Sequence, residues 1–191
     1  MKKSEVRGPK SEVQKTKAEG GTTESPRSKS SGHVDGGLRT SDLGRRTLIV
    51  GYGNPLRSDD ALGWHASRLL AEALAGKDVE VITCHQLTPE LAEPLSKCRR
   101  AVFIDADAEG KPGEIHRRTV RPQALTSSAF THTCTGPGLL ASAKQLYGRR
   151  PQAIVITVTA LSFEFGDTLS PVVAAALPKV VEQVLKWVGA A

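Results

Sequence analysis

The stretch TLIVGYGNPLRSDDALGWHASRLL, residues 47–70, decides the fold. It opens with apolar and β-branched residues and runs into a glycine-rich segment at residues 51–55, which predicts a buried strand followed by a loop. From Leu62 to Leu74 apolar residues recur at spacings of three and four, and Gly76 follows the last of them. This spacing predicts a helix with one apolar face that ends at the glycine. A strand, a loop and a helix in this order form the opening unit of an α/β domain.

The rest of the sequence continues this alternation of strands and helices. We expect buried strands at 79–83, 101–104 and 152–158, a charged edge strand at 114–117, and helices at 89–97, after Pro137 and after Pro171. This order predicts an α/β fold: a three-layer α/β/α sandwich around a mostly parallel sheet of about five strands, in which the edge strand can be antiparallel. In such a sheet ligands bind beyond the carboxyl ends of the strands.

The positive charge of the chain is concentrated in its first 46 residues. The 191 residues carry a formal net charge of +6 from 26 Lys and Arg against 20 Asp and Glu; residues 1–46 hold 11 of the basic and 6 of the acidic side chains, a net of +5, which leaves +1 for residues 47–191. The same 46 residues have few sizeable aliphatic side chains and cannot bury enough apolar surface to offset the entropy of ordering. We therefore expect a disordered basic tail at 1–46 and one nearly neutral domain at 47–191. We expect neither nucleic acid nor a membrane as a partner.

Hydropathy and cysteine content bear on location. No run of about 18 apolar residues is present, and the N-terminus lacks the apolar core of a secretory signal. The three cysteines, Cys84, Cys98 and Cys134, fit neither a disulfide framework nor a CxxC zinc site. We expect a cytoplasmic protein with reduced thiols.

Two adjacent carboxylates, Asp59 and Asp60, stand at the junction between the glycine-rich loop and the first helix. The junction fails as a dinucleotide-binding fingerprint, because Leu56 replaces the third glycine of GxGxxG and because paired acids repel a phosphate. We expect Ser58 or Asp59 to cap the helix, and one acid of the pair to face a site that favours a cation.

Two further candidate site residues are expected near this junction. Asp105 directly follows the apolar run 101–104, and His132 lies in a polar loop that leads into a helix. Adjacent central strands would bring Asp105 close to Asp60, so that two carboxylates converge on one crevice. The alternatives are an Asx-turn at Asp105 and an ordinary surface role for His132. Two oxygen donors and one imidazole together would form an open site for a divalent transition metal.

Five segments of the sequence match the pattern of one protein family: LIVGYGNPLRSDDALGWHASRLL, HQLTPELAEPL, FIDADAEGKPGEI, FTHTCTGPGLLASAKQLYGRRP and FEFGDTLSP. In order and spacing they resemble the hydrogenase maturation endopeptidases. Members of that family remove a short C-terminal extension from the precursor of the large subunit of [NiFe]-hydrogenase after nickel insertion. The resemblance implies that this precursor is the partner, and that Asp60, Asp105 and His132 contact its nickel and position the scissile bond. It implies no tightly bound organic cofactor.

The sequence departs from the family's pattern around the acidic pair. Glycines that commonly flank the pair are replaced by Ser58 and Ala61, which adopt a positive φ less readily than glycine, while Gly63 is retained. Asp107 is a second candidate for the acid at the end of the strand, but the position directly after the apolar run favours Asp105.

The chemistry of cleavage is not specified by a protease motif, because neither HExxH nor GxSxG is present. Cys134 is a candidate nucleophile, but nothing nearby is expected to lower its pKa, and we favour the role of a small residue at the start of a helix. Our hypothesis is that nickel carried by the substrate, held between Asp60, Asp105 and His132, polarises the scissile carbonyl or a water. Two other functions remain open. One is a non-catalytic relative that binds a nickel-loaded partner or delivers metal through the same crevice; the other is a nucleotide-binding module, which the failed fingerprint disfavours.

Overall fold

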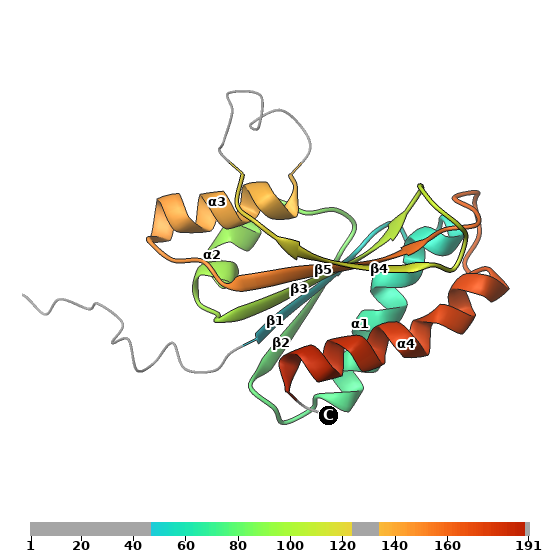
Figure 1. Ribbon diagram of the computed structural model, residues 1–191, viewed down its shortest axis with the longest axis horizontal. Helices are drawn as coiled ribbons and strands as arrows, with labels where there is room; N and C mark the ends of the chain where they lie inside the picture. The colour runs from blue at the N-terminus through green and yellow to red at the C-terminus, as the bar shows by residue number, and fades with distance from the viewer. Residues whose placement is uncertain (1–46, 124–133, 190–191) are drawn as a thin grey trace, which may run out of the picture. The chain divides into compact units, whose positions relative to one another are not determined.

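The computed structural model describes residues 47–123 and 134–189. The expected tail, residues 1–46, lies outside them, so its boundary stays a prediction. In the described residues five strands form one sheet in the order β2-β1-β3-β5-β4 (Figure 1). They are β1 (Thr47–Tyr52), β2 (Val79–Cys84), β3 (Arg100–Asp107), β4 (Ile115–Val120) and β5 (Gln152–Thr159). Neighbouring strands are parallel except for β4, which runs antiparallel to β5 at the edge of the sheet. The predicted mostly parallel sheet is confirmed.

Helices cover both faces of the sheet (Figure 1). One face carries α1 (Leu62–Ala73) and α4 (Pro171–Val188), and the other carries α2 (Ala92–Ser96) and α3 (Gly136–Tyr147). Two short 3-10 helices, η1 (Ser58–Ala61) and η2 (Pro89–Leu91), lead into α1 and α2. The expected three-layer α/β/α sandwich is therefore confirmed. No helix among the described residues combines the length and the apolar character needed to span a membrane.

Each central strand contributes side chains to two apolar cores. In β1, Leu48 and Val50 pack with α2 and α3, whereas Ile49 packs with α1 and α4. In β3, Phe103 packs in the core with α2 and α3, and Val102 packs in the core with α1 and α4. Because both faces of these strands are buried, their sequences read as continuous apolar runs rather than as alternating patterns. Truncating one such side chain to alanine typically costs about 2–5 kcal/mol, which is the scale on which the cores hold the helices to the sheet.

The start of α1 lies against the carboxyl end of β1 with no room for a side chain between them. A Cβ atom on Gly51 would collide with the backbone carbonyl of Gly63 and with the hydroxyl of Ser67, and a Cβ atom on Gly63 would collide with the backbone of Tyr52. The two glycines therefore let the helix approach the strand at backbone distance. This contact fixes η1, which directly precedes α1, at the end of the sheet.

The carboxyl ends of β1 and β3 flank a switch point in the topology. β2, which follows β1 in the chain, pairs on one side of β1, and β3 pairs on the other. Ligands of open α/β sheets bind at such a point. β3 is longer than the sequence predicted, because it pairs with β5 as far as Asp107 and Thr159. The prediction that Asp105 directly follows the strand is therefore wrong: Asp105 lies within it.

Candidate functional site

Asp60 lies in η1, between the glycine-rich loop and α1. The backbone N–H of Asn54 donates to its Oδ2 at 2.8 Å, and no described residue donates to its Oδ1. Gly53, at φ +131°, passes so close to Asp60 that a Cβ atom on it would collide with the carbonyl oxygen of Asp60. The residue is only partly buried. One carboxylate oxygen of Asp60 is thus anchored to the loop and the other is available to a ligand.

Asp59 has a different role, although it is the next residue in the sequence. It is fully buried and accepts four hydrogen bonds from the segment that joins β5 to α4. Its Oδ2 accepts from the N–H groups of Leu161 (2.8 Å) and Ser162 (3.1 Å) and from the hydroxyl of Ser170 (2.9 Å), and its Oδ1 accepts from the N–H of Ser170 (2.7 Å). Asp59 therefore ties that segment to η1 and leaves Asp60 as the acid that can meet a ligand.

Ser58 adopts a strained backbone conformation. It has φ +45° and is the one non-glycine residue with a positive φ in the described part of the chain. Its N–H donates to the carbonyl of Gly166 at 2.9 Å, and its hydroxyl donates to the carbonyl of Glu164 at 3.0 Å. Ala61 has ordinary helical angles, φ −73° and ψ −4°. Of the two replaced glycines, only the one at Ser58 carries strain, which costs about 1–2 kcal/mol for an L-residue.

The expected cap at the start of the first helix is absent. Neither η1 nor α1 begins with a side-chain cap hydrogen bond, so the prediction that Ser58 or Asp59 caps the helix is wrong. The physical reason is competition between partners. Both side chains bond the segment between β5 and α4 instead, and sequence spacing does not reveal a partner that lies more than 100 residues away.

Asp105 lies on β3, with Tyr52 of β1 on one side and Thr157 of β5 on the other. Its carboxylate accepts hydrogen bonds from the Tyr52 hydroxyl and, at 2.9 Å, from the N–H of Ala106. Burial raises the pKa of Asp105 to about 7; the two hydrogen bonds act in the opposite direction, and the nearby charge of Asp60 adds to the increase. Asp60 and Asp105 are therefore close enough for their charges to interact. With a pKa raised to about 7, Asp105 is partly protonated at neutral pH, and a cation would have to displace that proton.

Of the three expected ligands, the structure describes Asp60 and Asp105 but not His132. Within 47–123 and 134–189, no group of three or more His, Cys, Asp and Glu side chains is arranged to hold a metal ion. His132, the third residue of the expected set, lies outside the described residues. The structure therefore brings together the two carboxylates and leaves the three-residue set a prediction.

Cys134 is partly buried just before α3, where it packs against the apolar core formed with α2 and α3. Burial raises the pKa of its thiol, and the negative charge of Glu90 raises it further. A nucleophilic cysteine needs the opposite shift, because the thiolate is the reactive form. The environment of Cys134 therefore argues against a nucleophilic role and agrees with that of a small residue near the start of a helix.

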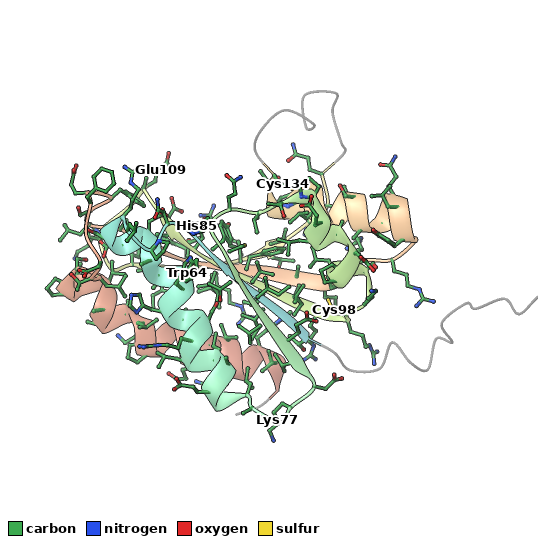
Figure 2. The ribbon with its side chains drawn as sticks, turned by 180° about the vertical axis from the view of Figure 1, so that it is seen from behind. Trp64, Lys77, His85, Cys98, Glu109 and Cys134 are labelled. Atoms are coloured by element: carbon green, nitrogen blue, oxygen red, sulfur yellow. The ribbon has the colours of Figure 1, made fainter. Side chains whose placement is uncertain are left out.

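Trp64 and His85 frame the glycine-rich loop and were not singled out by sequence reasoning. The indole N–H of Trp64, in the first turn of α1, donates to the carbonyl of Gly53 at 2.9 Å. Its ring meets that of His85 edge to face, with ring centroids 5.3 Å apart. Both residues are labelled in Figure 2. His85 follows Cys84, whose carbonyl accepts from the N–H of Gly53 at 3.2 Å. An aromatic residue in the first turn of the helix that follows the glycine-rich loop was the available signal.

Comparisons with known proteins identify the fold. No protein-family model matches the sequence, and none of the curated proteins matches it significantly. Solved structures do match. The hydrogenase maturating endopeptidase HybD from E. coli is 23% identical, with a TM-score of 0.60, over 74% of this chain and 91% of that one. A hydrogenase 2 maturation peptidase from a Thaumarchaeota archaeon is 25% identical, with a TM-score of 0.59, over 76% and 99% of the two chains.

The [NiFe] hydrogenase maturation protease HybD from Thermococcus kodakarensis is 27% identical to this chain, with a TM-score of 0.58, over 75% of this chain and 99% of that one. All three proteins are thus matched over nearly their whole length. The described part of the chain therefore has the fold of the hydrogenase maturation endopeptidases, and the resemblance seen in its motifs is confirmed by its structure.

Proposed function

We propose that this chain is an endopeptidase that removes the C-terminal extension from the nickel-loaded precursor of a [NiFe]-hydrogenase large subunit. The observation that supports it most is the pair Asp60 and Asp105, which interact at the carboxyl ends of β1 and β3 in this fold. The matched structures named hydrogenase maturation proteases support a protease role in hydrogenase maturation. The nickel-loaded precursor as substrate, and as partner, is the finer part of the proposal. The cytoplasmic location stays a prediction.

Two interacting carboxylates account for recognition of the substrate's nickel. Asp105 is partly buried and repelled by Asp60, so a divalent cation between them would replace repulsion by attraction and offset the cost of burial. Ni²⁺ binds both carboxylate oxygen and imidazole nitrogen. His132 would be the third contact.

On this proposal Asp60, Asp105 and His132 hold the nickel that the substrate carries, and they thereby fix the scissile peptide bond at the site. The nickel polarises the scissile carbonyl or a water molecule. The water oxygen bonds to the carbonyl carbon, the C–N bond breaks, and a proton from the water passes to the leaving amine. The products are the shortened large subunit, with a new terminal carboxylate, and the free C-terminal peptide.

The test is a cleavage assay on purified protein. Nickel-loaded and nickel-free precursor are incubated with the enzyme, and the mass of the released peptide is measured. We expect release only from the loaded precursor, and its loss in Asp60→Ala and His132→Ala. Asp167→Asn is the matched control, since Asp167 is exposed and makes no ion pair among the described residues. Cleavage that survives both site substitutions would overturn the site assignment.

The same assay separates the alternative function. A protein that only binds a nickel-loaded partner, or delivers metal to it, would capture the loaded precursor and release no peptide. Binding without cleavage under single-turnover conditions would therefore replace the endopeptidase proposal by the binding one.

A further inference from the structure

Three polar side chains stand in a row across the middle of the sheet, at its carboxyl end. Asp105 of β3 pairs with Thr157 of β5, and the pairing of Gly51 with Ile104 places the next residues, Tyr52 and Asp105, side by side. All three point to the face covered by α2 and α3, because paired residues of a sheet share a face and Tyr52 packs against the core on that face. Asp105 therefore has a hydroxyl-bearing neighbour on each flanking strand.

The first neighbour already bonds the carboxylate. The partly buried Tyr52 donates its hydroxyl to Asp105, beside the 2.9 Å bond from the N–H of Ala106. The hydroxyl of Tyr52 is carried on a rigid ring and has a single proton to donate, so this bond restricts the rotation of the carboxylate. Tyr52 itself belongs to β1, a strand buried on both faces, and is not free to follow a moving partner.

The second neighbour has a hydroxyl without a partner. Thr157 is 8% exposed, and its Oγ1 is buried with no hydrogen bond in the part of the chain that the structure describes. Buried hydroxyl groups are rarely left unsatisfied, and each such case calls for an explanation. Its position offers one: Thr157 pairs with Asp105 across the two strands, so its hydroxyl is a donor within reach of that carboxylate when the carboxylate turns toward a ligand.

We propose that Tyr52 and Thr157 are positioning residues that hold Asp105 from its two flanking strands and aim its carboxylate at the metal carried by the substrate. The inference rests on the proposed function, because it concerns the same site. Carboxylates that bind metals are themselves hydrogen-bonded, and removing the group that orients them typically lowers metal affinity or activity by about 10–100-fold. Tyr52 holds Asp105 from β1, and Thr157 offers the carboxylate a second donor from β5.

The experiment removes one hydroxyl at a time. Tyr52→Phe keeps the ring, and Tyr147→Phe is its matched control, since Tyr147 is the only other tyrosine and lies exposed at the end of α3. Thr157→Val keeps the volume of the side chain, and Thr157→Ser restores the hydroxyl. For each variant the single-turnover cleavage rate of nickel-loaded precursor, the Kd for loaded and nickel-free precursor, and the Tm without substrate are measured.

We expect Tyr52→Phe to cleave about 10–100-fold more slowly, with Tyr147→Phe unchanged. We expect Thr157→Val to lose about tenfold in rate while its Tm stays equal or rises, and Thr157→Ser to recover most of the rate. A merely structural role would move rate and Tm in the same direction. Wild-type rates in Tyr52→Phe and Thr157→Val would overturn this inference and leave the proposed function standing. A wild-type protein that neither cleaves the loaded precursor nor binds it more tightly than the nickel-free form would overturn both.

Discussion

The neighbouring aspartates Asp59 and Asp60 should respond to substitution in opposite ways. Asp59→Asn keeps the shape of a fully buried side chain that accepts four hydrogen bonds from 161–170. The amide oxygen can take the position of Oδ2 and keep three donors, but the amide NH₂ then faces the N–H of Ser170. The hydrogen bond from the N–H of Ser170 is lost, and that N–H then faces the amide NH₂, which is also a donor. The three remaining hydrogen bonds become weaker, because their acceptor no longer carries a negative charge.

These effects set the magnitude. A hydrogen bond to a charged group contributes about 1.5–3 kcal/mol and one to a neutral group about 1 kcal/mol, so three weakened bonds and one lost bond cost about 5 kcal/mol. Burying a neutral amide instead of a charge recovers about 2 kcal/mol. We expect Asp59→Asn to lower the free energy of unfolding by about 3 kcal/mol and the Tm by about 10 °C. Asp60→Asn removes at most one partly buried bond, from Asn54, and should cost about 1 kcal/mol or less.

The assay is guanidinium denaturation of both variants, paired with the cleavage assay well below the lower Tm. Asp60→Asn should be stable and inactive, whereas Asp59→Asn should be unstable and retain most of its activity while folded. If Asp60→Asn proves the less stable of the two, or if Asp59→Asn unfolds at the wild-type denaturant concentration, the division of roles between the two acids is wrong.

The remaining predictions concern strain, charge and packing. Ser58→Gly and Ser58→Ala both lose the serine hydroxyl, but only glycine relieves the strain at φ +45°. In denaturant titrations the free energy of unfolding of Ser58→Gly should therefore exceed that of Ser58→Ala by about 1 kcal/mol. Equal free energies of unfolding would show that position 58 is not strained. The pKa of Asp105 is raised to about 7 in the folded protein, against about 4 unfolded, so the wild type should lose up to about 4 kcal/mol as pH rises from 4 to 8. Asp105→Asn should lack that loss and be the more stable protein at pH 8; parallel pH profiles of unfolding would contradict this. Gly51→Ala should cost about 3 kcal/mol or more, because its Cβ meets the backbone of Gly63, whereas Gly76→Ala, at φ +76° with open space, should cost about 1 kcal/mol in the same titration.

The sequence predicted the layers and the sheet, because hydropathy alone distinguishes a strand that is buried on both faces from a helix that is buried on one. Strands β1 and β3 have apolar side chains in both cores, and α1 has a single apolar stripe. It did not predict that β3 continues past Ile104, because Asp105 and Asp107 are polar and their strand conformation comes from pairing with β5. Register likewise sets what lies beside Asp105. No local sequence pattern predicts that Tyr52 and Thr157 flank Asp105.

The role of Asp59 was hidden for a related reason. Two acids at a helix start look equivalent in sequence, and capping is the ordinary explanation for either. What separates them is a segment more than 100 residues later, whose N–H groups converge on Asp59 and leave Asp60 with one bond. Long-range partners of this kind are decided by the fold. They become visible only when the strands have been placed.

The charge state of Asp105 bears on how the proposed enzyme would distinguish loaded from nickel-free precursor. Without metal, Asp105 is partly protonated at neutral pH, and its ionised form is repelled by Asp60. A nickel-free precursor offers no positive charge to relieve that repulsion, so docking it would bury two carboxylates at a cost. A nickel-loaded precursor replaces one proton by a divalent cation and gains both carboxylates as ligands. The same pair of acids would therefore both hold the correct substrate and reject the incorrect one, and the preference should weaken as pH falls below 7, because the proton then competes more strongly with the metal.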